Sequence, residues 1–391
     1  MRLAYFSPLP PARSGIADYS RELLPHLAQR AALTLYAPDP AAVSADLRAQ
    51  FEVRAYDQYP GERWAYDLAL HQMGNSSHHA AQYALLQRYP GVVVLHDYVL
   101  HHFIAHHTVG QGRPAGYARE LGYTLGVEGV ALAQAVLHGR IPHPLFSEPL
   151  NARVVDLSLG LIVHSRYVQQ RILARHPDRA VQVIPALIEP LPGRSRRAEL
   201  GLPADALLFA SFGQVTANKR IDLALAALAQ ISAEIPQAYY LLVGEVHPQV
   251  DLASLIQQFG LGERVRHLGF APDLATFVDW IHTADVVINL RDPTAGETSA
   301  TALRALAAER PLIVFDQGWY SELPDDAALK LPPNDLPALA QALRALAQDP
   351  ARRRALGAAG GRYTRARCHP AQVAAAYADF LRARLAALQA S

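Results

Sequence analysis

The residue types best suited to ligand chemistry gather in the stretch PTAGETSATALRALAAERP, at positions 293–311. It separates two short apolar runs, which predicts a helix between two buried strands. The start of this helix is small, hydroxylic or acidic rather than apolar: Gly296, Glu297, Thr298 and Ser299. The unpaired N–H groups and partial positive charge of a helix start suit a phosphate, while Glu297 could face sugar hydroxyls. The alternative is an ordinary cap with an acidic first turn.

A second candidate segment, SFGQVTANKRIDLALAAL, occupies positions 211–228. An apolar strand ends at Gly213, and a polar loop follows from Gln214. Lys219 and Arg220 then open the next helix, where basic side chains oppose the helix dipole. A negatively charged ligand would relieve that conflict, whereas the alternative is a pair of solvated surface charges.

Polar residues also follow apolar runs in the first half of the chain. Gly15 lies in a predicted strand-to-helix loop, where its amide could approach a phosphate or a sugar; a plain turn is the alternative. His96 and Asp97 stand at the carboxyl end of a buried run and could bind or polarise an acceptor, although histidine clusters are often surface or core-edge residues. Asp97 and His101 have a spacing that metal ligands sometimes use. No acidic triad or cysteine completes a ligand set, so no metal is expected.

Composition limits the classes of protein that this chain can be. It has 391 residues, of which 51% are hydrophobic and 18% charged, which favours large folded cores over disorder. The formal net charge of +1 gives no global attraction to nucleic acid. The single Cys368 excludes an internal disulfide framework and fits a reducing compartment. No apolar run reaches the length of a signal peptide or a spanning helix, so we expect a cytoplasmic protein.

The order of apolar runs predicts how these residues are positioned. Short runs rich in Val, Leu, Ile and Tyr alternate with helical patterns, as in parallel strands joined by helical crossovers. The fold class is therefore α/β, with two Rossmann-like, doubly wound parallel-sheet domains at 1–188 and 199–369 and a linker at 189–198. Ligands of such sheets bind outside the carboxyl ends of the strands, so we expect a central cleft that both domains face. The segment 370–391 carries an apolar stripe and is expected to pack back on the first domain.

In order along the chain, the early glycine loop, the FG…NKR segment, the VGE and LGF strands and the GETS helix resemble the retaining GT-B glycosyltransferases of family 4, the group 1 transferases. The resemblance spans nearly the whole chain. SPLPPARSGIADYS and NLRDPTAGETS are similar to a bacterial branch found among cell-surface polysaccharide enzymes. The resemblance implies a nucleotide diphosphate sugar as co-substrate, bound mainly by the second domain, and no other cofactor. It also implies a glycan or lipid-linked acceptor, and a lipid-linked one would bring the protein to the inner face of the cytoplasmic membrane.

The resemblance assigns the phosphate contacts of the second domain. Lys219 matches the lysine that meets the diphosphate, and Gly213 begins the same motif. Gln214 stands where many members of the family have a second phosphate-binding arginine. We therefore expect Arg220 or Arg291 to supply the missing charge.

The resemblance also assigns the rest of the donor site. The segment at Phe270 matches the part that holds the nucleobase, and Gly244 lies near the same floor. The family has two glutamates eight positions apart; Glu297 matches the first after a one-residue shift, and Arg304 replaces the second. The usual ribose contact thus has no counterpart, and Arg304 suits a phosphate or an acidic neighbour instead.

These assignments predict sugar transfer with retention at the anomeric carbon. Lys219, a nearby arginine and the amides after Gly296 would meet the charge of the leaving diphosphate, and Glu297 would orient the sugar. No carboxylate nucleophile stands out, which favours attack from the front face, assisted by the leaving phosphate. Two alternatives stay open. One is a non-catalytic partner subunit, suggested by Arg304, and the other is a sugar-nucleotide epimerase.

Overall fold

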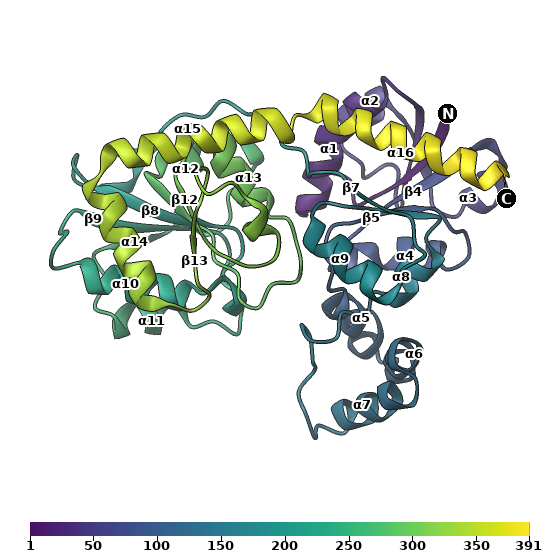
Figure 1. The fold of residues 1–391 in the computed structure, drawn as a ribbon, viewed down its shortest axis with the longest axis horizontal. Coiled ribbons are helices and arrows are strands. Elements are labelled where there is room, and N and C mark those ends of the chain that lie inside the picture. Colours follow the sequence, from purple (N-terminus) through teal and green to yellow (C-terminus); the bar gives the residue numbers. More distant parts are fainter. Residues whose placement is uncertain (391) are drawn as a thin grey trace. The chain divides into compact units, whose positions relative to one another are not determined.

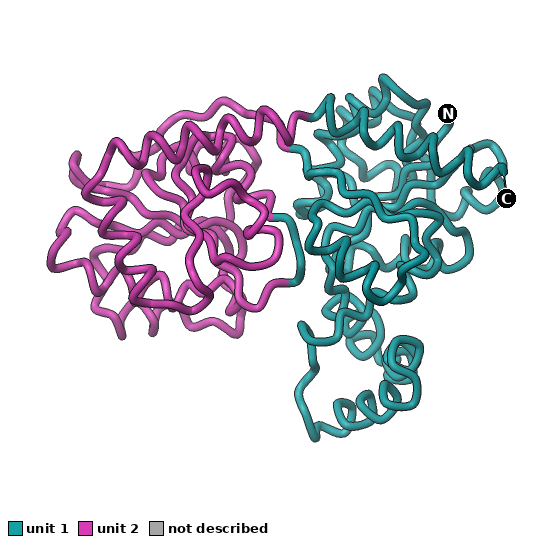
Figure 2. Tube along the Cα trace, viewed as in Figure 1, with its two compact units in different colours: residues 1–187, 295–298, 370–391 teal, residues 188–294, 299–369 magenta. Residues whose placement is uncertain are grey.

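The computed structural model describes residues 1–390 and divides into two compact units (Figure 2). Unit 1 contains residues 1–187, a four-residue insertion at 295–298, and the C-terminal stretch from Pro370. Unit 2 contains residues 188–294 and 299–369. The expected linker at 189–198 falls within unit 2. The chain therefore passes between the units more than once.

Unit 1 is built on a seven-stranded sheet in which every pairing is parallel, in the order β3-β2-β1-β4-β5-β6-β7. The central strands β4, β5 and β6 are buried along their whole length, and β5 and β6 are entirely apolar, as is usual for strands covered on both faces. The strand order reverses between β1 and β4, which is where open α/β sheets bind ligands. The strands are β1 (Arg2–Phe6), β2 (Ala32–Ala37), β3 (Glu52–Ala55), β4 (Leu68–Met73), β5 (Val92–Leu95), β6 (Gly160–Val163) and β7 (Val181–Val183).

Helices connect these strands, and an additional helical segment follows β5 (Figure 1). The connecting helices are α1 (Gly15–Leu27), α2 (Ala45–Gln50), α3 (Tyr59–Glu62), α4 (Ala80–Leu86), α8 (Ala152–Leu157) and α9 (Arg166–Arg175). The additional segment contains α5 (His101–Thr108), α6 (Pro114–Leu125) and α7 (Val127–Leu137). Helices α6 and α7 pack closely because Gly129 lies against the carbonyl of Leu121, where any side chain would collide.

The last helix, α16 (Pro370–Ala390), belongs to unit 1 and lies along α1 (Figure 1). Val373, Tyr377 and Leu381, spaced four residues apart, form its buried stripe. The Tyr377 hydroxyl makes a buried 2.6 Å hydrogen bond with the hydroxyl of Tyr19 on α1. The final helix thus completes the packing of the first unit.

We expect Tyr377→Phe to lower the free energy of unfolding by about 1 kcal/mol, because it removes one buried hydrogen bond and little packing. Urea unfolding would measure the change. Tyr123→Phe is a matched control, because the exposed Tyr123 hydroxyl donates to Asp156 and its loss should have a smaller effect. The double variant Tyr19→Phe/Tyr377→Phe should lose less than the sum of the single variants. Simple additivity would show that the two hydroxyls do not act as a pair.

Unit 2 contains a six-stranded parallel sheet in the order β10-β9-β8-β11-β12-β13. Its strands are β8 (Leu207–Phe212), β9 (Ala238–Val243), β10 (Val265–His267), β11 (Val286–Ile288), β12 (Leu312–Phe315) and β13 (Leu329–Leu331). Its helices are α10 (Ile221–Ile231), α11 (Leu252–Gln258), α12 (Leu274–Thr283), α13 (Ala300–Ala307), α14 (Leu336–Gln348) and α15 (Pro350–Arg367). The strand order reverses between β8 and β11. The prediction of two Rossmann-like parallel-sheet domains is confirmed, and the cleft between them stays a prediction.

Candidate active site

The best-defined part of the candidate site is the turn that follows β8 in unit 2. Lys219 ends a short 3₁₀ turn, Ala217–Lys219, and its ammonium donates a 2.8 Å hydrogen bond to the carbonyl of Phe212. Gly213 has φ +78°, and a Cβ atom on it would lie 2.8 Å from the Lys219 ammonium. The turn therefore fixes a positive charge directly at the carboxyl end of a central strand.

We expect Gly213→Ala to weaken nucleotide binding, because the new methyl group would displace the Lys219 ammonium. The positive φ should also lower stability by about 1 kcal/mol. Gly201→Ala is the matched control, since Gly201 has φ +61° and open space at its Cβ position. Calorimetric titration with UDP and urea unfolding of both variants would separate the two effects. If both variants bind UDP alike, space beside the ammonium does not matter.

Arg220 is the N-cap residue of α10 rather than part of the helix, and its backbone has a left-handed conformation with φ 51°. Its guanidinium donates to both carboxylate oxygens of Asp222, at 3.1 and 3.0 Å. The same side chain lies 3.9 Å from the carboxylate of Asp292. The hydrogen bonds to Asp222 raise the pKa of Arg220. A phosphate at Arg220 would therefore have to compete with two carboxylates of the protein.

The neighbouring strand ends form a connected floor. Gly244 has φ 154°, and a Cβ atom on it would lie 2.2 Å from the carbonyl oxygen of Gly213. The ring of His267, the last residue of β10, is hydrogen-bonded to the carbonyl of Gly244 at 2.8 Å. Gln214 is exposed beside these loops. Phe270 follows β10 and is 47% exposed.

The loop between β11 and α13 lies against the Lys219 turn. The amide of Asp292 donates a 2.7 Å hydrogen bond to the carbonyl of Asn218. The carbonyl of Arg291 accepts from the side-chain amide of Gln317, and the Arg291 guanidinium donates to the carbonyl of Leu290 at 3.0 Å. The structure thus brings the segments 217–220 and 291–294 together at one edge of unit 2.

The sequence offers Thr298 or Ser299 as the cap of helix α13, and the structure confirms Ser299. The first residue of the helix is Ala300, and Ser299 is the cap, with its hydroxyl accepting from the amide of Ala302 and from the side chain of Asn289. The buried hydrogen bond between Asn289 and Ser299 fixes the start of α13. Glu297 and Thr298 therefore precede the helix. Arg304 lies in the middle of α13 and is only 7% exposed.

The residues just before Ser299 are grouped with unit 1. The amide of Val99 donates a 2.9 Å hydrogen bond to the carbonyl of Ala295. Gly296 is buried with φ +74°, and a Cβ atom on it would lie 2.6 Å from that of Tyr98. The Glu297 carboxylate accepts a 2.8 Å hydrogen bond from the amide of Ala295, which orders the loop. Since Lys219 belongs to unit 2, its juxtaposition with Glu297 stays a prediction.

In unit 1, His96 is part of a hydrogen-bonded chain at the carboxyl edge of the sheet. One ring nitrogen is 2.7 Å from the side-chain oxygen of Gln72, and the other is 3.2 Å from His164. The second ring nitrogen of His164 lies 2.9 Å from the carbonyl of Ile184. Burial lowers the pKa of His96 well below its usual value and that of His164 to about 4. Both rings are therefore neutral near pH 7. With one N–H each, they donate in at most two of these three contacts and contribute no charge.

Two other predicted residues lie at the same edge of unit 1. The carboxylate of Asp97 accepts a 2.8 Å hydrogen bond from the amide of Asn75. Gly15 begins α1 after the cap Ser14, and a Cβ atom on it would meet open space. Gln72 shows no signal in the sequence, because its contact with His96 depends on the pairing of β4 with β5.

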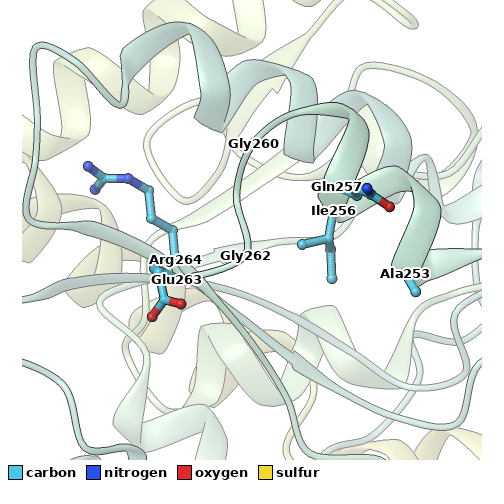
Figure 3. Close-up of a pocket in the computed structure, with 7 residues that line it drawn as sticks. All are labelled: Ala253, Ile256, Gln257, Gly260, Gly262, Glu263 and Arg264. Atoms are coloured by element: carbon cyan, nitrogen blue, oxygen red, sulfur yellow. The ribbon is translucent and has the colours of Figure 1, made fainter.

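Unit 2 also has a pocket that none of the candidate site residues lines (Figure 3). It lies between Ala253, Ile256 and Gln257 of α11 and the loop 260–264. That loop leads into the first residue of β10, so the pocket is at the amino edge of the sheet. The candidate residues of unit 2 lie at the opposite, carboxyl edge.

The two parallel-sheet units have the GT-B fold. Residues 206–349, which include the Lys219 turn and α13, match the family model for glycosyl transferases group 1. This match and the fold together support a GT-B glycosyltransferase. They agree with the resemblance seen in the sequence.

Relatives with similar sequences are also named as glycosyltransferases. Over 259 residues the chain is 29% identical to a D-inositol 3-phosphate glycosyltransferase of Kineococcus radiotolerans, covering 58% of each chain. Over 186 residues it is 28% identical to the lipopolysaccharide core biosynthesis glycosyltransferase LpsD of Rhizobium meliloti, covering 47% of this chain and 51% of LpsD. The matches thus span little more than half of these relatives.

Solved structures share the fold over the whole chain. The structure of Anabaena HepE in complex with UDP has a TM-score of 0.69 at 17% identity, covering 98% of this chain and all of HepE. A sucrose-phosphate synthase from Thermosynechococcus elongatus has a TM-score of 0.70 at 19% identity, covering 99% of this chain and 100% of that one. Within residues 1–390, no helix combines the length and apolar character needed to cross a membrane.

Proposed function

We propose that this chain is a retaining glycosyltransferase that moves a sugar from a nucleoside diphosphate sugar to a glycan or lipid-linked acceptor. The observation that carries the proposal is the Lys219 ammonium, held at the end of β8 by the carbonyl of Phe212. This turn lies within the segment that matches the group 1 family model. The names of the relatives and the UDP bound by HepE support a nucleotide sugar as the donor.

In the proposed reaction, the bond between the anomeric carbon and the diphosphate oxygen breaks, and the electron pair leaves with the diphosphate. The acceptor oxygen bonds to the anomeric carbon on the same face, and its proton passes to a phosphate oxygen. Lys219 and the start of α13 stabilise the negative charge where it develops. Glu297 orients the sugar. The neutral His96 chain shapes the acceptor side through hydrogen bonds alone.

The acceptor is proposed to bind unit 1, and a lipid-linked acceptor would place the protein at a membrane face. Val127 at the start of α7 is 84% exposed and Val130 is 42% exposed, so this helix presents apolar side chains to its surroundings. Co-sedimentation with anionic vesicles, compared between the wild type and Val127→Ser, would test the membrane contact. Equal sedimentation of both proteins would show that α7 does not contribute to the membrane contact.

A thermal-shift screen against common nucleotide sugars would identify the donor, because a bound donor stabilises the folded protein. Incubation with that donor and candidate acceptors should release the nucleoside diphosphate. Nuclear magnetic resonance of the product would give the configuration at the anomeric carbon. An inverted product would exclude retention, and an isomerised donor formed without acceptor would indicate an epimerase instead.

The buried Arg304, at the position of an expected acid, favours one alternative, a non-catalytic partner subunit. A calorimetric titration with UDP, ADP and GDP separates the two cases. The absence of any nucleotide binding in the folded protein would favour the partner subunit over the transferase.

A further inference from the structure

Three loops at the carboxyl edge of unit 2 meet at a single carboxylate oxygen. The oxygen belongs to Asp292, in the loop after β11. The side-chain amide of Asn334, after β13, donates to it at 2.5 Å, and the guanidinium of Arg220, after β8, lies 3.9 Å from it. The Arg220 and Asp292 side chains are only 22% and 29% exposed. One acid thus connects loops that lie more than 100 positions apart in the sequence.

Two of these three residues have a backbone conformation that residues with a side chain rarely adopt. Arg220 has φ 51° and Asn334 has φ 62°, both in the left-handed region where glycine is the least strained residue. Asparagine tolerates this region, but a long side chain such as arginine gains nothing from it locally. A residue kept in an unfavourable conformation points to a contribution from its side chain.

The backbone links the same loops to the candidate phosphate site. The amide of Asp292 donates to the carbonyl of Asn218, the residue immediately before Lys219. The side-chain amide of Asn218 reaches the carbonyl of Pro293 at 3.5 Å. Any displacement of the Asp292 loop therefore acts directly on the turn that carries the Lys219 ammonium.

We propose that Arg220, Asp292 and Asn334 form a latch that positions the Lys219 turn for the diphosphate, with Arg220 a positioning residue rather than a phosphate ligand. The proposal rests on the proposed function. Arg220 already donates two hydrogen bonds to Asp222 and faces Asp292, so its charge is balanced within the protein. The latch fixes the position of Lys219, and Lys219 alone of this turn meets the ligand.

The sign of one substitution distinguishes the latch from simple electrostatics. Asp292→Asn removes a negative charge near the phosphate site, so electrostatics alone predicts tighter binding of UDP. The latch predicts weaker binding, because the loop loses its ion pair with Arg220. We expect the dissociation constant for UDP to rise about tenfold. Tighter or unchanged binding would overturn the proposal.

Two further variants remove latch side chains without straining the backbone. Arg220→Gly and Asn334→Gly place glycine at a positive φ, so thermal stability should hold or rise while UDP binding weakens by a similar factor. A merely structural role would lower both together. Glu309→Gly is the matched control, because Glu309 has φ 55° and pairs with Arg365. It should leave UDP binding unchanged; weaker binding in this control would refute a specific latch.

Amide hydrogen exchange of the ligand-free proteins tests the latch even if the wild type binds no UDP, ADP or GDP. That failure would count against the proposed function alone. The latch predicts faster exchange at 216–220 and 291–294 in Arg220→Gly and Asn334→Gly than in the wild type and Glu309→Gly. Unchanged exchange in these segments would overturn the latch independently of any donor.

Discussion

Lys219→Ala is expected to lower the rate of sugar transfer about 10²- to 10³-fold, the usual effect of losing one contact that stabilises developing charge. The ammonium is held at the end of β8, where the leaving diphosphate is proposed to lie. Stability should change little, because the Lys219 side chain is partly exposed and the net contribution of its hydrogen bond to Phe212 is small. Steady-state rates of nucleoside diphosphate release would measure the effect.

The chain provides its own control for this prediction. Lysine occurs at only two positions, 219 and 330, and Lys330 also donates to a backbone carbonyl, that of Leu323. Lys330→Ala should therefore transfer sugar at the wild-type rate. Amine-directed labelling adds a second measurement, since bound UDP should protect Lys219 and not Lys330. Equal rates in both alanine variants would remove Lys219 from the mechanism.

Glu297→Gln is expected to reduce turnover about 10²-fold while UDP binding is retained. Glutamine keeps an oxygen that can accept from the amide of Ala295, so the loop should stay ordered and only the charge is lost. A decrease in turnover without loss of nucleotide affinity would assign the carboxylate to the sugar rather than to the diphosphate.

Two variants complete that test. Glu297→Ala also removes the loop hydrogen bond and should show a larger loss than Glu297→Gln. Glu263→Gln, at the pocket on the opposite edge of unit 2, should behave as the wild type. Full activity in Glu297→Gln would show that the transfer does not need this charge.

Most strands could be predicted because apolar residues predominate in each run. The six strands of unit 2 overlap the apolar runs that the sequence shows at 207–213, 239–245, 264–270, 285–290, 311–316 and 328–333. In unit 1, no apolar run predicts β3. This edge strand has the sequence Glu-Val-Arg-Ala and is half exposed, so it gives no continuous apolar signal. Helical spacing predicts a stripe of Val373, Tyr377, Phe380, Leu381, Leu385 and Leu388 on the final helix. The structure buries Val373, Tyr377 and Leu381, whereas Phe380, Leu385 and Leu388 are only half-buried.

The parts of the site that depend on long-range contacts could not be predicted. Arg220 reads as a free cation in the sequence, and only the folded loops show that Asp222 and Asp292 balance it. Asp292 and Asn334 look like ordinary turn residues. The insertion 295–298 into unit 1 leaves no pattern either, because it depends on the fit of Gly296 against Tyr98. Such contacts are set by topology rather than by residue periodicity.

The placement of α16 has a consequence for the order of folding during synthesis. Domains generally fold as they leave the ribosome, N-terminal domain first. Here α16, which packs on α1, is translated after the whole of unit 2. Unit 2 can therefore be complete while unit 1 still lacks its last helix and Tyr19 lacks its contact with Tyr377. Proteolysis of nascent chains stalled before residue 370 should therefore find unit 2 protected and unit 1 still open to cleavage.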